Sequence, residues 1–340
     1  MFIPKYNQSQ KLLTNITQIE RLYGRLEALR IPQNLELNLE RNNLIQSSYI
    51  SNSIEGNPLS LPEVTNLLLG DRVPANREEK EVKNYFEILK NLDFYTNQVL
   101  SLTTMKQIHQ QLLTGVNDKI AGEIRNKKVI IGHYRKEEEK LALDIKHEPP
   151  FHTKIHIEKA ILQLLDWVAE GKTSLAIVKA GIFHHQFVYI HPFEDGNGRV
   201  CRLLTALLFI QSGYLINKYF VLDDWYDIDR SLYSDKLHSA DSGDKTEWLE
   251  YFSDGVKYSL QGALARVKNV METLSIEKRP TAREQEVLKL FQVIKEMTST
   301  DLARKLYISR QQAHNLLISL VEKGLLGKKG QTKSTYYFVR

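Results

Sequence analysis

The residues best suited to chemistry lie between His191 and Arg202, where the sequence reads HPFEDGNGRVCR. Gly196, Asn197 and Gly198 separate an acidic residue from two arginines, and an apolar run follows directly. This order predicts a loop that leads into a buried helix. The start of a helix offers free backbone N–H groups and a positive dipole end, and glycines let a ligand approach that backbone closely. The segment therefore indicates a cradle for the phosphates of a ligand.

The charged side chains around this loop have types that suit phosphate chemistry. Arg199 and Arg202 are three residues apart, so both fall on one side of the first helical turns and can reach different phosphates. Asp195 could hold the Mg²⁺ that accompanies a di- or triphosphate. His191 is placed to accept a proton from a nucleophile. The alternative is an ordinary turn with a solvated charge pair.

The same twelve residues match HPFx[D/E]GNGRxxR, the signature of the Fic family, at every specified position. The chain therefore resembles Fic proteins, whose usual activity is the transfer of AMP from ATP to a Ser, Thr or Tyr hydroxyl of a protein. The resemblance implies that His191 is the general base and that Asp195 is the Mg²⁺ ligand. It implies that Gly196 to Gly198 cradle the phosphates and that Arg199 and Arg202 clamp them. ATP as co-substrate and Mg²⁺ as cofactor follow from the same resemblance.

A second segment, residues 51–57, reads SNSIEGN and is predicted to end a helix, with Gly56 as the stop. Ser51 and Glu55 are four residues apart and share one face. Read alone, Glu55 is an exposed acid beside a helix end. The pattern resembles the Fic inhibitory motif [S/T]xxxE[G/N], which implies that Glu55 pairs with Arg202 and takes the seat of the ATP γ-phosphate. Such a desolvated, charge-assisted pair would contribute about 2 to 4 kcal/mol.

Two β-branched runs, Val129 to Ile131 and Leu141 to Ile145, flank a charged turn at residues 135–140 and predict a β-hairpin. The unpaired edges of an isolated hairpin could hold an incoming extended peptide. In Fic proteins a hairpin at this place, the flap, positions the target segment beside the catalytic histidine. A surface hairpin without a function is the alternative.

Further candidates lie on the helices around the signature. Family members often carry paired tyrosines near the next helix start, and this chain keeps Tyr233 but has Ser234 in second place. Tyr233 is therefore a candidate contact to the adenine. His184 and His185 precede His191, but no acid stands at the right spacing for zinc, so packed core histidines are expected.

The last sixty residues, after Pro280, predict a winged helix-turn-helix. Helices are expected at residues 282–296, 299–306 and 309–322, followed by a glycine- and lysine-rich stretch and a β-rich end. Residues 280–340 carry 11 Lys and Arg against 5 Asp and Glu, a net charge of +6, against 35 and 36, or −1, in the rest. Contact with DNA and contact with protein are both compatible with this segment.

Within that segment, the residues expected to touch DNA fall in two groups. Arg310 and Gln311 begin the expected recognition helix and could reach base edges, while Lys328, Lys329 and Lys333 lie on the expected wing and suit phosphates.

Length and composition limit the number of domains, the location of the protein and the kinds of cysteine site. A chain of 340 residues is expected to hold two or three domains. It has no run of 18 apolar residues and no signal-peptide pattern, so a cytoplasmic protein without a membrane partner is expected. The single cysteine, Cys201, excludes an internal disulfide and a multi-cysteine zinc site.

We therefore predict a mainly α fold: a Fic helical bundle with a small β-hairpin flap, plus a C-terminal winged helix-turn-helix domain. The expected domains are residues 1–110 with the inhibitory motif at 51–56, residues 111–275 as catalytic core, and residues 280–340. The predicted function is that of a protein adenylyltransferase, which transfers AMP from ATP to a Ser, Thr or Tyr hydroxyl of a protein. Glu55 is expected to inhibit this transfer, and the chain is expected to modify itself as well. The expected partners are a protein substrate and DNA, and a homodimer stays open.

Two alternatives follow from the same residues. Glu55 could position a water and so make the protein remove AMP from a modified partner. The chain could also be a DNA-binding regulator in which the Fic core responds to nucleotide.

Overall fold

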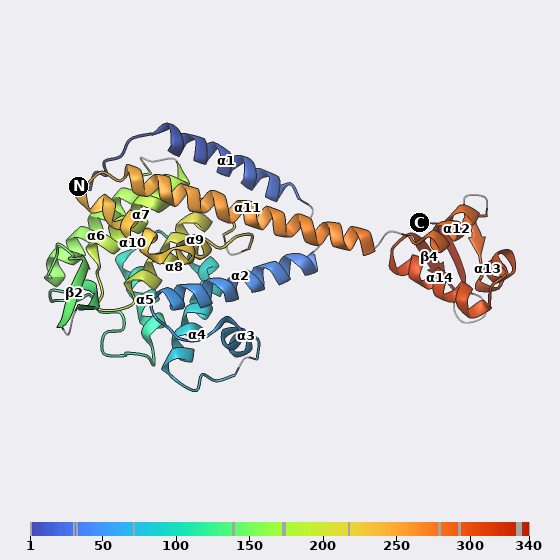
Figure 1. The fold of residues 1–340 in the computed structure, drawn as a ribbon, viewed down its shortest axis with the longest axis horizontal. Coiled ribbons are helices and arrows are strands. Elements are labelled where there is room, and N and C mark those ends of the chain that lie inside the picture. Colours follow the sequence, from blue (N-terminus) through green and yellow to red (C-terminus); the bar gives the residue numbers. More distant parts are fainter. Residues whose placement is uncertain are drawn as a thin grey trace. The chain divides into compact units, whose positions relative to one another are not determined.

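The computed structural model describes residues 2–29, 31, 33–70, 72–137, 140–171, 175–216, 218–277, 280–291, 294–330 and 335–339. They pack as two units, residues 1–265 and residues 266–340. Helices dominate both, with two small antiparallel sheets, so the prediction of a mainly α fold is confirmed (Figure 1). None of the helices in the described ranges is both long enough and apolar enough to cross a membrane.

The first unit is a helical bundle, in which the helices at its surface, such as α1 and α4, bury one apolar face. Its helices and short 3₁₀ turns are α1 Gln10–Glu27, α2 Gln33–Ile54, α3 Leu61–Leu69, α4 Arg77–Lys90, η1 Leu92–Tyr95, α5 Leu102–Leu113, α6 Lys154–Ala169, α7 Ala176–Ile190, α8 Asn197–Gln211, α9 Asp223–Ile228, α10 Arg230–Ser239, η2 Ala240–Ser242 and α11 Thr246–Glu277. The last of these helices runs past residue 265 into the second unit.

Helix α8 lies at the centre of this bundle. Every residue from Arg199 to Phe209 is buried, and α8 packs against α7, α5, α2 and α4. A helix that is covered on all sides is expected to be apolar all round, as its sequence is from Leu203 onward. The two arginines at its start are the exception, so their burial places two cations inside the bundle.

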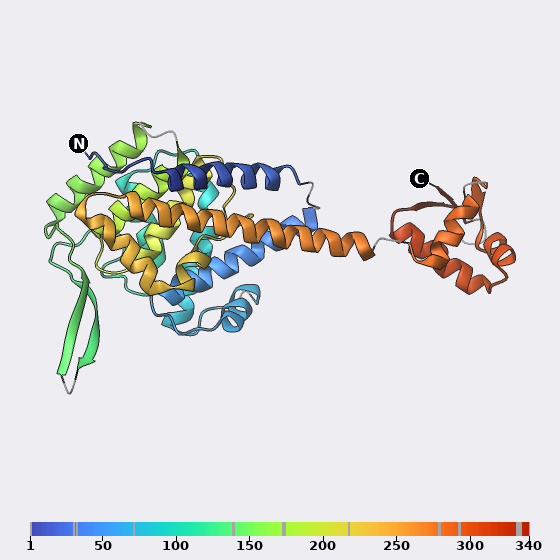
Figure 2. The ribbon, with the colours of Figure 1, turned by 45° about the horizontal axis from the view of Figure 1, so that its top comes forward.

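Helix α2 brings the predicted inhibitory motif to this centre. It packs against α4, α9 and α8, and its C-terminal end lies at the start of α8. Along the opposite flank, α1 lies beside α11 in both views (Figures 1 and 2), joined by hydrogen bonds such as Asn15 Nδ2 to Ser253 Oγ at 3.0 Å.

The hairpin consists of β1 Ile131–Glu137 and β2 Lys140–His147, which pair antiparallel. Figure 2 shows it extending away from the helices. The expected hairpin is confirmed, but its first strand was placed wrongly. Val129 and Ile130 precede the strand, and the charged residues 135–137 lie within it because they pair with residues 140–142 of β2. Glu138 and Glu139, part of the expected turn, lie outside the described residues.

The second unit has its own core. It contains α12 Ala282–Phe291, β3 Glu296–Met297, α13 Ser299–Leu306, α14 Arg310–Glu322, β4 Leu326–Lys329 and β5 Tyr336–Val339, with the strands in the order β3-β5-β4. The expected helix 282–296 is wrong at its end. Helix α12 stops at Phe291, because Glu296 and Met297 pair with β5 and Met297 is buried in the core.

Lys333 lies outside the described residues. The winged helix-turn-helix assignment stays a prediction, and so do the expected domain bounds.

Candidate active site

His191 ends helix α7 in the left-handed conformation, with φ 52°. Its backbone N–H donates to the Phe187 carbonyl at 2.9 Å. Its carbonyl accepts a hydrogen bond from Nε of Arg125 at 2.6 Å, and the buried Arg125 also donates to the Ile190 carbonyl at 3.2 Å. The position of His191 is thus fixed both by its own helix and by the segment that leads to the hairpin.

The imidazole of His191 is neutral in this environment. Burial, with smaller contributions from the neighbouring His147 and Arg125, lowers its pKa to about 3. Its Nδ1 is buried and has no hydrogen-bond partner among the described residues. A neutral imidazole can accept a proton, which is what a general base requires.

The loop after His191 is held from beneath. Phe193 is fully buried and stacks on the His109 ring at 3.7 Å between centroids. His109 accepts the Gly122 N–H at Nδ1, 2.9 Å away, and its Nε2 lies 3.1 Å from the Asp195 carbonyl, to which it donates. Helix α5 therefore supports the loop through one neutral histidine, and burial keeps the pKa of that histidine at about 4.

The glycines and Asn197 shape the start of α8. Gly196 has φ 75°, a conformation that favours glycine, and is the N-cap of the helix. The Asn197 side chain bridges back to Phe193: its Oδ1 accepts the Phe193 N–H and its Nδ2 donates to the Phe193 carbonyl, both at 2.9 Å. The amide of Asn197 is therefore used to brace the loop, and what Asn197 offers a ligand is its backbone.

Asp195 lies at the open edge of the loop. Its side chain is 42% exposed, and Oδ1 accepts the Gly196 N–H at 2.6 Å and lies 3.5 Å from Nη2 of Arg199. Mg²⁺ in phosphate sites binds one or two carboxylates together with waters and phosphate oxygens. An accessible carboxylate beside a phosphate cradle fits that donor set.

Arg199 has few strong contacts although it is buried. Its Nη1 lies 3.4 Å from Glu81 and 3.5 Å from Oδ1 of Asn52, and its Nε has no hydrogen-bond partner among the described residues. A buried guanidinium normally satisfies its donors. The Nε–H of Arg199 is thus a buried donor that no described residue satisfies.

Arg202, in contrast, is fully engaged by the end of α2. Its Nε donates to Ser51 Oγ at 2.7 Å, and its Nη2 donates to the Ser51 carbonyl at 2.8 Å and to Oε1 of Glu55 at 2.7 Å. Burial alone would lower its pKa, but Glu55, Asp223 and two neighbouring tyrosines together outweigh burial and raise the pKa, so the guanidinium stays charged. The expected contact between Glu55 and Arg202 is present.

The Glu55 carboxylate also lies directly over the backbone of the cradle. A Cβ added to Gly198 would lie 2.1 Å from Oε1 of Glu55 and 3.1 Å from Nη1 of Arg202. The space above the second residue of α8 is thus filled by the carboxylate. Glycine at 198 is required for this close approach.

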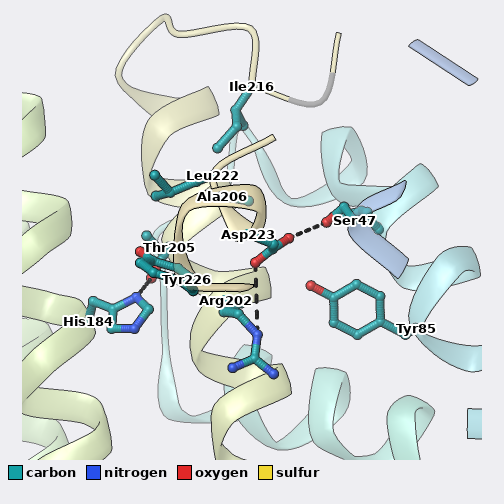
Figure 3. A pocket seen from close by; sticks show the side chains of 11 residues that line it. Ser47, Tyr85, His184, Arg202, Thr205, Ala206, Ile216, Leu222, Asp223 and Tyr226 are labelled. Atoms are coloured by element: carbon teal, nitrogen blue, oxygen red, sulfur yellow. Dashed lines mark hydrogen bonds and ion pairs between the residues drawn. The ribbon is translucent and has the colours of Figure 1, made fainter. Parts of the chain in front are cut away.

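Two residues of this site were missed from the sequence. Asp223 is buried on the other side of Arg202, with Oδ1 3.8 Å from Nε of Arg202 and Oδ2 accepting from Ser47 Oγ at 2.5 Å (Figure 3). Burial raises its pKa to about 6, against the opposing charge of Arg202. Arg230 donates to the Ser53 carbonyl at 2.8 Å and to Ser53 Oγ at 2.9 Å, and so holds the end of α2.

Tyr233 is buried in the core, and its hydroxyl is hydrogen-bonded to another core side chain instead of facing the cradle. Thr205 Oγ1 donates to the Cys201 carbonyl, so it must accept from His184 Nδ1, 3.0 Å away (Figure 3). His184 Nε2 then accepts from the Tyr233 hydroxyl at 2.9 Å. Because the hydroxyl is used in this way, the predicted contact to adenine would have to come from the ring.

The comparisons with known proteins agree with this geometry. The glycine cradle at the start of α8, the histidine before it and the two arginines that line it all lie within one matched segment. Residues 99–209 match the family model described as Fic/DOC family.

Several relatives are similar along most of the chain. Protein adenylyltransferase fic-1 of Caenorhabditis elegans is 27% identical over 250 residues, which cover 70% of this chain and 45% of that protein. Protein adenylyltransferase Fic of Culex quinquefasciatus is 26% identical over 257 residues, covering 72% and 47%. The chain thus spans about half the length of the curated relatives it matches.

Solved structures extend the likeness to the whole chain. The crystal structure of a Fic family protein from Desulfovibrio desulfuricans superposes with a TM-score of 0.68 at 25% identity and covers 100% of this chain and 98% of that one. Fic-1 of Caenorhabditis elegans, at 23% identity and a TM-score of 0.61 over 76% of this chain and 73% of that one, shares the fold.

Proposed function

We propose that the chain is a protein adenylyltransferase that transfers AMP from ATP to a Ser, Thr or Tyr hydroxyl of a protein. The observation that carries this proposal is the meeting of a neutral, half-buried His191 with a glycine cradle and the underused guanidinium of Arg199. The names of the relatives support the same reaction class.

In the proposed reaction the target hydroxyl gives its proton to His191 while its oxygen attacks the α-phosphorus of ATP. A new P–O bond to the target forms, the bond to the leaving pyrophosphate breaks, and AMP stays on the target. The backbone N–H groups at Gly196 to Gly198 and the side chain of Arg199 hold the phosphates. Asp195 would hold Mg²⁺, which when bound neutralises part of the polyphosphate charge.

Glu55 is proposed to keep this reaction slow. Its carboxylate fills the space over Gly198 and engages Arg202, the second guanidinium that a polyphosphate would use. A polyphosphate must therefore displace the carboxylate and break the ion pair. A contribution of about 2 to 4 kcal/mol from such a pair corresponds to an inhibition of about 30-fold or more.

The test follows label from α-³²P-ATP onto protein in the presence of Mg²⁺, with and without cell extract as a source of targets. We expect Glu55→Gly to label at least about 30-fold more than wild type and Glu55→Gly/His191→Ala to return to background. Glu170→Gly is the matched control, because Glu170 also stands at a helix end directly before a glycine.

Equal labelling by wild type, Glu55→Gly and Glu170→Gly would overturn the inhibitory role. Labelling that survives His191→Ala would overturn the proposed base. Label on the chain itself without extract tests self-modification.

A second candidate function is removal of AMP from a modified protein. It is favoured by the exposure of Glu55: the Arg202 contact uses Oε1, and the side chain remains 31% exposed, so water can reach the carboxylate. Here wild type would release AMP from a modified target, and Glu55→Gly would not. Release by both proteins would contradict a role for Glu55 in hydrolysis.

For the second unit we propose contact with DNA. The start of α14 and strand β5 line a groove through Arg310, Gln311, His314 and Tyr337. A salt-dependent gel shift of the full chain that is weakened by Arg310→Ala and by Lys328→Ala/Lys329→Ala would support it. Unchanged shifts would favour protein docking, and sedimentation of the same samples would measure dimer formation.

A further inference from the structure

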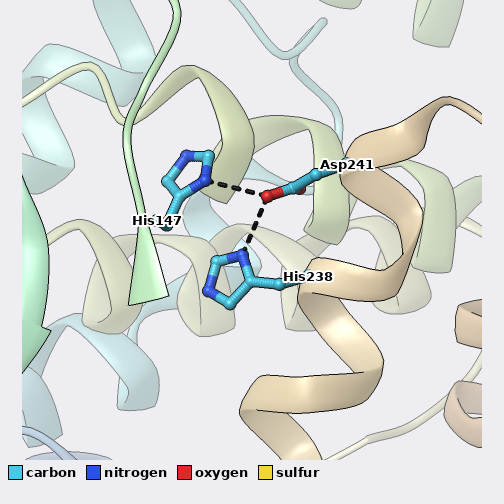
Figure 4. Close-up of side chains that lie close together, drawn as sticks. All are labelled: His147, His238 and Asp241. Carbon is cyan, nitrogen blue, oxygen red and sulfur yellow. Dashed lines mark hydrogen bonds and ion pairs between the residues drawn. The ribbon is translucent and has the colours of Figure 1, made fainter. Parts of the chain in front are cut away.

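A second cluster of ligand-type side chains lies where the hairpin returns to the helices (Figure 4). It consists of His147, the last residue of β2, His238 of α10 and Asp241 of η2. Asp241 Oδ2 lies 2.9 Å from Nδ1 of His147 and 3.1 Å from Nδ1 of His238. The end of β2 and the stretch from α10 to η2 thus present two imidazole nitrogens and one carboxylate oxygen within 4.8 Å of one another.

Both ring nitrogens of His147 face oxygen atoms that accept hydrogen bonds. Nε2 of His147 lies 3.1 Å from the Tyr189 carbonyl oxygen, which can only accept, so Nε2 carries the hydrogen. In the neutral ring, Nδ1 then presents a lone pair to Asp241 Oδ2 at 2.9 Å. Two acceptors at this distance require a cation or a proton between them.

The surroundings of the cluster match the outer shell of metal sites. A metal-bound histidine typically donates its other N–H to a backbone carbonyl, as His147 does to Tyr189, and a metal-bound carboxylate is itself hydrogen-bonded. Asp241 Oδ1 accepts from Nε2 of His185 at 2.9 Å. Nζ of Lys245 donates to Nδ1 of His185 at 2.8 Å and so fixes the tautomer of His185 that makes this bond.

The spacing and exposure suit a borderline divalent transition ion. In a tetrahedral zinc site with bonds of about 2.0 to 2.1 Å, the ligand atoms are about 3.3 Å apart. Asp241 Oδ2 lies 2.9 and 3.1 Å from the two ring nitrogens, which is close to that spacing, and the two nitrogens lie within 4.8 Å of each other. His147 is 3% exposed, whereas His238 and Asp241 are 18% and 25% exposed, so solvent reaches the cluster from their side. A water from that side can complete the coordination.

We propose that His147, His238 and Asp241 bind one Zn²⁺ and that this ion fixes the base of the hairpin to α10. The site is distinct from Asp195 and does not depend on the proposed reaction. Because His147 is the residue at which β2 ends, the ion joins the hairpin directly to the helical body. Its expected role is to anchor the hairpin.

The test uses the full chain without an affinity tag, stripped of metal with a chelator. Calorimetric titration with Zn²⁺ is expected to give one equivalent per chain, and Co²⁺ is expected to give the visible absorption of a tetrahedral site. His238→Ala is expected to weaken binding at least tenfold. His152→Ala, which removes an exposed histidine, and Asp195→Ala are expected to bind as wild type does.

Asp241→Asn provides a second variant, and circular dichroism without metal shows whether each variant is folded. Absence of stoichiometric binding by wild type, or equal binding by His238→Ala and Asp241→Asn, would overturn the site and leave a proton-bridged cluster. Hydrogen exchange of residues 131–137 and 140–147 tests the anchoring. We expect Zn²⁺ to slow exchange in wild type but not in His238→Ala, and unchanged exchange would overturn the anchoring role.

Discussion

At the residue scale, Arg202 is the position on which the site depends. Its Nη2 donates to the carboxylate of Glu55 at 2.7 Å, and its Nε lies 3.8 Å from a second carboxylate, that of Asp223. The hydroxyl of Ser51 satisfies its Nε. The guanidinium is therefore held in place by the end of α2, through Ser51 and Glu55.

Ser51→Ala tests this dependence. The substitution leaves the buried Nε–H of Arg202 without its 2.7 Å partner, so we expect a loss of about 1 to 3 kcal/mol in the free energy of unfolding. We expect AMP transfer to rise, but less than in Glu55→Gly, because the carboxylate remains. Chemical denaturation and the labelling assay measure the two effects. Ser48→Ala, a buried serine of α2 whose hydroxyl donates to its own helix, is the control.

A second prediction at this scale concerns pH and His184. Burial keeps its pKa in the folded protein well below the usual 6.5, and its hydrogen bonds to Thr205 and Tyr233 fit only the neutral ring. Below pH 6.5 the unfolded chain binds a proton that the folded chain does not. The contribution of the neutral His184 to the free energy of unfolding is therefore fully present above pH 6.5 and is lost as the pH falls below 6.5.

Thermal unfolding between pH 7.5 and 5 measures this loss. His184→Gln is expected to be less stable than wild type at pH 7.5 but to lose less stability on acidification. A mutant whose melting temperature falls with pH as steeply as that of wild type would contradict the assignment. His156→Gln, an exposed histidine, should behave as wild type does.

At the element scale, Arg230 holds the end of α2. Arg230 bonds both the carbonyl and the hydroxyl of Ser53 and is itself paired with Asp227. Arg230→Ala removes these exposed bonds without touching Glu55 or Arg202. We expect AMP transfer to rise about two- to fivefold, the range of an exposed ion pair.

Arg283→Ala is the control for this substitution, because Arg283 is also exposed and paired with an acid three residues away. No rise in transfer with Arg230→Ala, or an equal rise with both variants, would show that this contact does not restrain α2.

The elements also show which features the sequence could predict. The central helix, the hairpin and the end of α2 have local signals: a glycine loop before an apolar run, two apolar runs around a charged turn, and a glycine stop. Asp223 has none, because its partners come from distant segments, and the cluster has none for His147, because His238 and Asp241 lie about 90 residues further along the chain. The brace made by Asn197 was missed for a related reason: a motif specifies the residue but not the direction of its side chain.

Strand ends were the least predictable elements. Glu296 was expected to be the last residue of a helix, but it pairs with β5, and its neighbour Met297 is buried. In the hairpin, cross-strand pairing extends β1 into charged residues that have little β propensity of their own. Tertiary pairing overrides local propensity at both places.

At the scale of the whole molecule, the two units each bury a core of their own. We therefore expect calorimetry to resolve two unfolding transitions. Leu317→Ala, which opens a cavity in the second core, should lower only one of them, by about 2 to 5 kcal/mol, and so identify the transition of the second unit.

ATP with Mg²⁺ should raise the unfolding temperature of the first unit alone, because that unit holds the cradle. In Glu55→Gly/His191→Ala, which frees the cradle and prevents turnover, nucleotide at about 100 times its dissociation constant stabilises the folded unit by about 2.7 kcal/mol. For a unit of this size that corresponds to a rise of about 5 to 10 °C. With His191→Ala alone the rise should be smaller at the same nucleotide concentration, because the Glu55 carboxylate competes for Arg202. An equal rise in both variants, or a shift of the second transition as well, would contradict a nucleotide site that Glu55 occupies in the resting protein.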